Sequence, residues 1–68
     1  MKFKIDNCHY DLVKDLLVSL DSLVKNVEKD YNGTIVTLQD GNSQEDLMKI
    51  LNQDPLHRFC ENSNVYAL

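Results

Sequence analysis

Two cysteines and two histidines are the residues of this chain whose types and spacing could support chemistry. They are Cys8, His9, His57 and Cys60. Such side chains bind zinc, and His57 and Cys60, three residues apart, would share one face of a helix. Adjacent ligands at Cys8 and His9 would point in different directions, and their spacing differs from that of standard zinc sites. We therefore predict no metal and no cofactor, and we keep these four residues as the alternative ligand set.

A catalytic role for the same residues would need more than the pairs that the sequence offers. Nucleophilic catalysis requires a thiol beside a base that a third group orients. Cys60 with His57, and Cys8 with His9, are pairs of a kind that arises by chance in almost any chain. A small domain also has little volume for a ligand pocket of about 300 Å³ or more. We predict that the protein is not an enzyme.

The length and composition are those of one small folded domain. The 68 residues include 43% hydrophobic and 26% charged residues, a balance typical of folded proteins. No apolar run approaches the ~20 residues of a membrane span, and residues 1–6 lack the apolar core of a signal peptide. We therefore expect a single domain, residues 1–68, in the cytoplasm. In that reducing compartment the cysteines would stay thiols, and a structural disulfide is the less favoured alternative.

The net charge of −4 is unevenly distributed along the chain. Residues 1–34 hold five lysines and six acidic residues (−1), whereas residues 35–68 hold two basic and five acidic residues (−3). Without a basic stripe to neutralise phosphates, we predict no direct binding to nucleic acid and no binding to an anionic membrane. The acidic half predicts a protein partner with a basic surface. The residues predicted to bind this partner are Asp40, Glu45, Asp46, Asp54 and Glu61.

The strongest hydrophobic period spans residues 10–31. The apolar positions are Val13, Leu16, Leu17, Leu20, Leu23, Val24, Val27 and Tyr31. They follow the i, i+3, i+4, i+7 spacing of an amphipathic helix. Such a helix would extend roughly 30 Å, the diameter of a small domain. We predict one long helix, ended by Asn32 and Gly33, against which every other element packs.

Shorter patterns predict the remaining elements. In chain order they are a strand at residues 2–5, the long helix, a strand at 34–39, a helix from residue 43 that breaks before Pro55, a short helix at 55–61 and a strand at 65–68. Right-handed crossovers between consecutive strands would give a small two-layer α+β domain with a parallel or mixed sheet. In the alternative, the protein is mainly α-helical, and the strand containing Ile35 pairs with its copy in a dimer.

These features favour a small acidic protein that acts by binding a macromolecular surface, as an inhibitor, an antitoxin-like protein or a regulatory partner. The alternatives are a metal- or thiol-dependent factor built on the Cys and His residues, and a self-associating structural domain. We also predict a homo-oligomer. Leu12 and Val18 lie off the main apolar stripe, and the strand containing Ile35 would leave an open edge, so these residues are the predicted oligomer interface.

Overall fold

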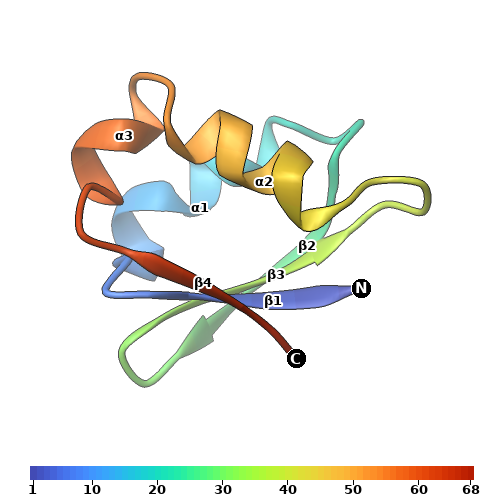
Figure 1. Cartoon of the computed structure of the whole chain (residues 1–68). Coiled ribbons are helices and arrows are strands. Elements are labelled where there is room, and N and C mark those ends of the chain that lie inside the picture. Colours follow the sequence, from blue (N-terminus) through green and yellow to red (C-terminus); the bar gives the residue numbers. More distant parts are fainter.

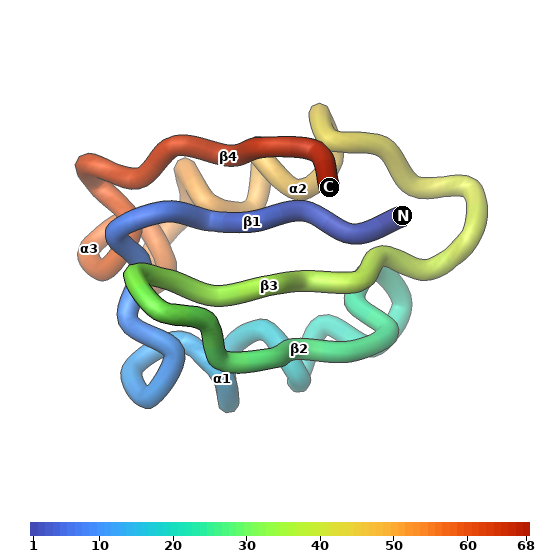
Figure 2. The backbone as a smooth tube through the Cα atoms, turned by 90° about the horizontal axis from the view of Figure 1, so that it is seen from below, coloured from blue at the N-terminus to red at the C-terminus, as the bar shows by residue number.

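The chain folds into a four-stranded sheet with all three helices on one face (Figure 1). The computed structural model describes all 68 residues. The elements are β1 (Lys2–Asp6), α1 (Tyr10–Val18), β2 (Val24–Asp30), β3 (Gly33–Leu38), α2 (Gln44–Leu51), α3 (Leu56–Phe59) and β4 (Asn64–Ala67). The strand order is β2-β3-β1-β4, and every neighbouring pair is antiparallel. The predicted α+β class is confirmed. The other face of the sheet carries no helix (Figure 2).

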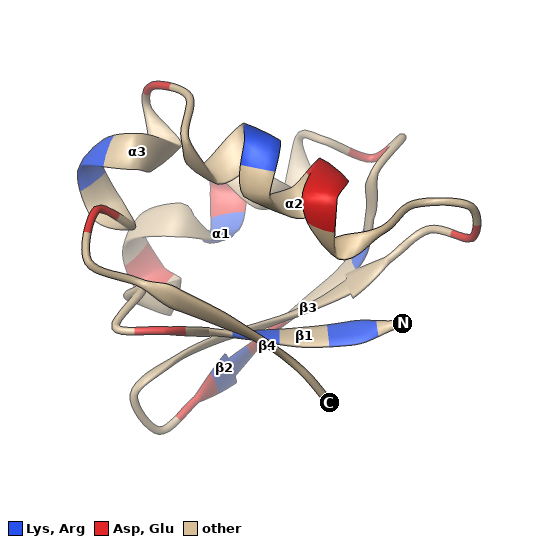
Figure 3. Ribbon diagram, in the orientation of Figure 1, with Lys and Arg blue, Asp and Glu red and all other residues tan.

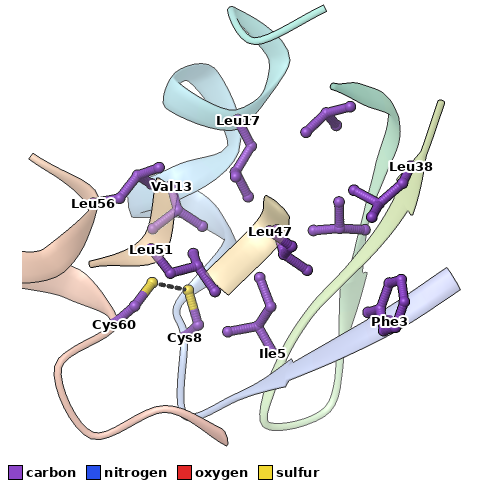
Figure 4. Close-up of a cluster of buried hydrophobic side chains, with 12 residues drawn as sticks. Phe3, Ile5, Cys8, Val13, Leu17, Leu38, Leu47, Leu51, Leu56 and Cys60 are labelled. Carbon is purple, nitrogen blue, oxygen red and sulfur yellow. Dashed lines mark hydrogen bonds between the residues drawn. The ribbon is translucent and has the colours of Figure 1, made fainter. Parts of the chain in front are cut away.

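The alternation of β1 places its apolar side chains in the core. Phe3 and Ile5 are buried under the helices, whereas Lys2 and Lys4 lie on the opposite face. Twelve hydrophobic residues form the core, and most of them are labelled in Figure 4. They come from β1, β2, β3, all three helices and the connections that follow β1 and α3. The helix layer and the sheet are therefore joined by one continuous apolar cluster.

The long helix predicted for residues 10–31 is wrong beyond Val18. The helix ends there, with Ser19 as its C-cap, and β2 follows after a short turn. Val24 and Val27 have helical spacing, but a β-bulge between Val24 and Asn26 shifts the register of β2. The extra residue lets side chains three positions apart face the same side of a strand. The same spacing of apolar residues therefore fits both an amphipathic helix and a bulged strand.

The turn at Tyr31 and Asn32 accounts for the second difference from the prediction. Instead of ending a helix, these two residues connect β2 to β3, and Asp30 is paired with Gly33 across the hairpin. A two-residue connection can join only antiparallel strands, whereas parallel strands need a long crossover. The predicted parallel or mixed sheet is therefore wrong, and the mainly helical alternative is not observed.

The second half follows the prediction more closely. Ser43 is the N-cap of α2, and its backbone N–H donates a hydrogen bond of 2.8 Å to the Asp46 carboxylate. The helix stops at Leu51, before Pro55, and α3 forms a single short turn inside the predicted range of 55–61. The predicted strand at 65–68 is observed as β4, which pairs with β1.

Candidate functional site

The acids predicted to bind a partner lie along the helix layer. Asp40 is exposed in the connection between β3 and α2, and Glu45 is exposed in the first turn of α2. Asp46, beside it, is half-buried and accepts the capping hydrogen bond from Ser43. A negative side chain in this turn also favours the helix dipole. Glu45 lies in the same turn and shares this effect, but Asp40 and Glu45 are the two acids here that make no capping hydrogen bond.

The two remaining acids lie farther along the chain, in different connections. Asp54 is exposed between α2 and α3, and Glu61 is exposed between α3 and β4. Figures 1 and 2 both show the α3–β4 connection at the opposite end of the molecule from the β3–α2 connection. The five acids thus follow the α2–α3 side from end to end. Asp40, Glu45 and Asp46 form its compact part, which we call the acidic corner.

The ion pairs of the structure all lie in one half of the chain. Lys2 bonds Glu28 at 3.8 Å, Lys4 bonds Asp30 at 2.7 Å and Lys29 bonds Asp11 at 3.6 Å. All three pairs use residues of the first half. In residues 35–68 no acid is within ion-pair distance of a lysine or arginine, so the charge of −3 there has no internal ion-pair partner. Figure 3 shows where the acidic and basic residues lie along the ribbon.

The shortest ion pair spans three strands of the bare sheet face. Lys4 on β1 reaches past β3 to Asp30 on β2, and its Nζ donates a hydrogen bond of 2.7 Å to Asp30 Oδ2. This hydrogen bond, with one from the backbone N–H of Tyr31, holds the pKa of the Asp30 carboxyl below its ordinary value. The ionised carboxylate therefore favours the folded chain.

We predict that Asp30→Asn makes the fold less sensitive to acid. Because the pKa of Asp30 is lower in the folded chain, its stabilisation is complete above about pH 4, where the carboxyl of an unfolded chain titrates. It is lost as the pH falls through the lowered pKa. Urea unfolding at a series of pH values should show a shallower fall in the free energy of unfolding for the variant. Parallel pH profiles for the two proteins would contradict this role of the ion pair.

Cys8 and Cys60 meet in the core although 52 positions separate them in the sequence. Their sulfur atoms are 2.7 Å apart and share a hydrogen bond (Figure 4). Cys8 follows β1, where its carbonyl oxygen accepts a hydrogen bond of 2.9 Å from Thr34 Oγ1. Cys60 ends α3, where its N–H donates to the carbonyl oxygen of Leu56 at 3.1 Å. Hydrogen bonds to the backbone of Cys8 and Cys60 thus fix the positions of both residues.

The two histidines do not join the cysteines. His9 is exposed at the N-cap of α1, and His57 is exposed in α3. The four side chains therefore do not form the tetrahedral set considered from the sequence, and no group of three or more His, Cys, Asp or Glu residues is arranged to hold a metal ion. Each thiol is hydrogen-bonded to the other thiol and not to the histidine considered beside it from the sequence.

The predicted oligomer-interface residues lie in different layers. Leu12 and Val18 are 53% and 60% exposed on α1, in the helix layer. Ile35 is half-buried on β3, where it lies opposite Lys4 on the bare face of the sheet. The three residues therefore do not form one surface.

The exposed side chains on the bare face of the sheet were not predicted from the sequence. Tyr66 on β4 is 50% exposed and lies opposite Lys4, so Ile35 and Tyr66 flank Lys4 across three strands. The signal was the period of two in β4, where Val65 is half-buried and Tyr66 is exposed. Ile35 lies between two paired charges, Glu28 and Lys4, whereas Tyr66 lies beyond them on the edge strand β4.

Hollows in the surface are small. The three of them have volumes of about 140, 230 and 300 Å³, at or below the lower end of the range for small-molecule sites. The hollow of about 230 Å³ lies between the start of α1 and the β2–β3 turn, with His9, Tyr10 and Tyr31 in its lining. None of the three is lined by Cys8 or Cys60.

Comparison with models of protein families, with characterised proteins and with solved structures finds no match for this chain. The structure contains no helix with the length and apolar character needed to cross a lipid bilayer. The charge distribution and the thiol pair are therefore the features on which a function can be argued.

Proposed function

We propose that this protein binds another protein through the acidic α2–α3 side, as an inhibitor or regulatory partner. One observation carries the proposal. Lysines pair with three of the six acids in the first half of the chain, whereas none of the five acids of the second half has a basic partner. The folded chain therefore presents a charge of −3 that only another molecule can neutralise, and the matching surface is basic.

The acidic corner is the proposed centre of the contact. Asp40 and Glu45 are exposed and close in the chain, so their fields add over a small area. A partner that covers about 800 Å² would form an interface of standard size, which a domain this small can provide. Electrostatic attraction would speed the encounter, and salt would weaken this effect because the Debye length is about 8 Å at physiological ionic strength.

The proposal includes a homo-oligomer as the binding unit and the cytoplasm as its location. Leu12 and Val18 support self-association, because both are large apolar side chains that remain more than half exposed. They lie on α1, so a second copy there would leave the acidic corner of α2 open. Light scattering across a concentration series gives the mass of the binding unit before any kinetics are measured.

The test is a double charge reversal, Asp40→Lys with Glu45→Lys. Asp46 is kept, because its loss would remove the cap of α2 and confuse binding with folding. The partner is first captured from source cells by cross-linking, and its association rate is then measured by stopped flow at several salt concentrations. We expect the rate at low salt to fall about tenfold or more, with a shallower salt dependence.

The matched control is Asp15→Lys with Asp21→Lys, which changes the net charge equally. Both residues are exposed in the first half and take part in no ion pair. We expect this variant to change the association rate much less, since the charges lie outside the acidic corner. Equal effects of the two variants, or no effect of either, would remove the acidic corner as the docking site.

A further inference from the structure

The pair of buried sulfurs lies where two distant parts of the chain are joined. Cys8 belongs to the connection from β1 to α1, and Cys60 to the end of α3, just before β4. They are the chain's two cysteines, and each is the hydrogen-bond partner of the other. A disulfide needs sulfurs about 2 Å apart, so a small side-chain adjustment from the observed 2.7 Å would be enough to form one.

We propose that Cys8 and Cys60 are a modification site, where hydrogen peroxide converts the two thiols to a reversible intramolecular disulfide. The proposal does not depend on the binding partner. It departs from the expectation that both cysteines stay thiols, because the fold brings together two side chains that the sequence leaves 52 positions apart.

The two sulfurs are not equivalent, and their differences assign their roles. Cys60 is 7% exposed and Cys8 is 1% exposed, so a small oxidant reaches Cys60 first. When the Cys8 thiol donates its proton toward Cys60, it lowers the pKa of Cys60 and raises its own pKa far above the ordinary range. Burial raises the pKa of both thiols, so the shared hydrogen bond and the greater exposure of Cys60 make the difference. Cys60 is thus the thiolate that attacks, and Cys8 the thiol that resolves.

Ser63 is a second neighbour of the attacking sulfur. Its hydroxyl oxygen is buried and has no hydrogen-bond partner in the reduced protein. Ser63 is held beside Cys60, because its backbone N–H donates to the Cys60 carbonyl oxygen at 3.1 Å. A free buried donor is unusual, because most buried polar groups are hydrogen-bonded. Here it is available to an ionised or oxygenated sulfur.

The chemistry proceeds in two balanced steps. The Cys60 thiolate attacks one oxygen of hydrogen peroxide, so an S–O bond forms, the O–O bond breaks and hydroxide leaves. Cys8 then loses its proton to that hydroxide and attacks the Cys60 sulfur, so the S–S bond forms and the S–O bond breaks. The second hydroxide takes up a proton from solvent. Two thiols and one peroxide give one disulfide and two waters, and a dithiol reductant reverses the change.

The disulfide would tie the α3–β4 end to the start of α1. The single-turn α3 is held by core packing and by local backbone hydrogen bonds, to which the disulfide would add a covalent link with a distant part of the chain. In the chain-entropy account, closing a loop of this length shifts the unfolding equilibrium by roughly a thousandfold toward the folded state. Oxidation would therefore stabilise the folded chain, and reduction would reverse this effect.

The experiment treats the reduced full-length protein with one equivalent of hydrogen peroxide under native conditions. We expect its intact mass to fall by two hydrogen atoms, with no oxygen added, and both cysteines to resist alkylation after denaturation. Dithiothreitol should restore both thiols. Urea unfolding of the oxidised form should then show a shift of the equilibrium of roughly a thousandfold, and treatment with dithiothreitol should abolish it.

Two single variants separate the roles of the sulfurs. Cys8→Ser should accumulate a sulfenic acid on Cys60 that dimedone captures, whereas Cys60→Ser should leave a Cys8 thiol that peroxide oxidises far more slowly. If either variant fails to fold, the wild-type mass measurement still decides the proposal. Two alkylatable thiols after peroxide treatment, an interchain disulfide or a mass increased by oxygen in the wild type would overturn it.

Discussion

Replacing Leu17 by alanine is expected to lower the free energy of unfolding by about 3 kcal/mol. Leu17 is fully buried on α1 and points into the core beside Val13 and Leu56 (Figure 4). A leucine removed from such a site loses its transfer free energy and leaves a cavity that neighbours fill only in part. A chain of 68 residues has a total stability of about 3–10 kcal/mol. The variant should therefore lose between about a third and all of this stability.

Leu12→Ala is the matched control, since it makes the same substitution in the same helix. Leu12 is 53% exposed, so we expect its loss to change the free energy of unfolding by about 0.5 kcal/mol or less. Urea titrations followed by circular dichroism compare the two variants directly. Similar urea midpoints for both would mean that α1 does not bury the face seen in the structure.

Gly33→Ala is expected to lower the free energy of unfolding by about 3 kcal/mol, at the upper end of the usual range for overpacking. A Cβ atom at this position would collide with the Ile5 carbonyl oxygen and lie 3.2 Å from Lys4 Cε. The first obstacle is the backbone of a central strand, which cannot move without disturbing its register with β3. The second is the side chain that reaches Asp30, so the substitution should also weaken this ion pair.

Gly41→Ala provides the contrast, because the second glycine is needed for a different reason. Gly41 has φ of +89°, and a Cβ atom there would meet no other atom within 4 Å. Its replacement carries only the strain of left-handed backbone, about 1 kcal/mol. Urea unfolding should thus place Gly41→Ala between the wild type and Gly33→Ala. A smaller loss for Gly33→Ala than for Gly41→Ala would contradict the close approach of β1 and β3.

Local signals predicted the elements that local physics determines. The alternation around Phe3 and Ile5 predicted β1, the β-branched run predicted β3, and Ser43 with Asp46 predicted the start of α2. In each case the decisive contacts lie within a few residues of the chain, as side-chain alternation or a capping hydrogen bond. These elements, with β4, were enough to identify the α+β class.

The failure at residues 19–31 has a nonlocal cause. Val24 and Val27 fit a helical stripe as well as they fit a bulged strand, and only pairing with β3 favours the strand. The contact between Cys8 and Cys60 is beyond sequence reasoning for the same reason, since 52 positions separate them. A pairing between distant positions depends on the topology of the whole chain, which periodicity does not specify.

The candidate binding surface was predicted in part. Counting charges identified the acidic half, but the lack of internal partners for its acids depends on strand register. Lys4 and Asp30 lie on the two strands that flank β3. The lysine side chain can cross β3 because Gly33, at the crossing point, has no side chain. The sequence predicted the cap at Ser43 and Asp46, and the structure adds that Asp40 and Glu45 are exposed.

The position of β1 in the sheet has a consequence for how the chain reaches its fold. β1 is the first strand made, yet it lies between β3 and β4. During synthesis its backbone stays unpaired until residues 33–38 emerge, and its second edge stays open until residues 64–67 follow. Contacts between such distant residues slow folding, and an unpaired strand edge favours association with other chains. The edge of β1 that β4 covers in the folded chain is therefore open to pairing with other chains until β4 is in place.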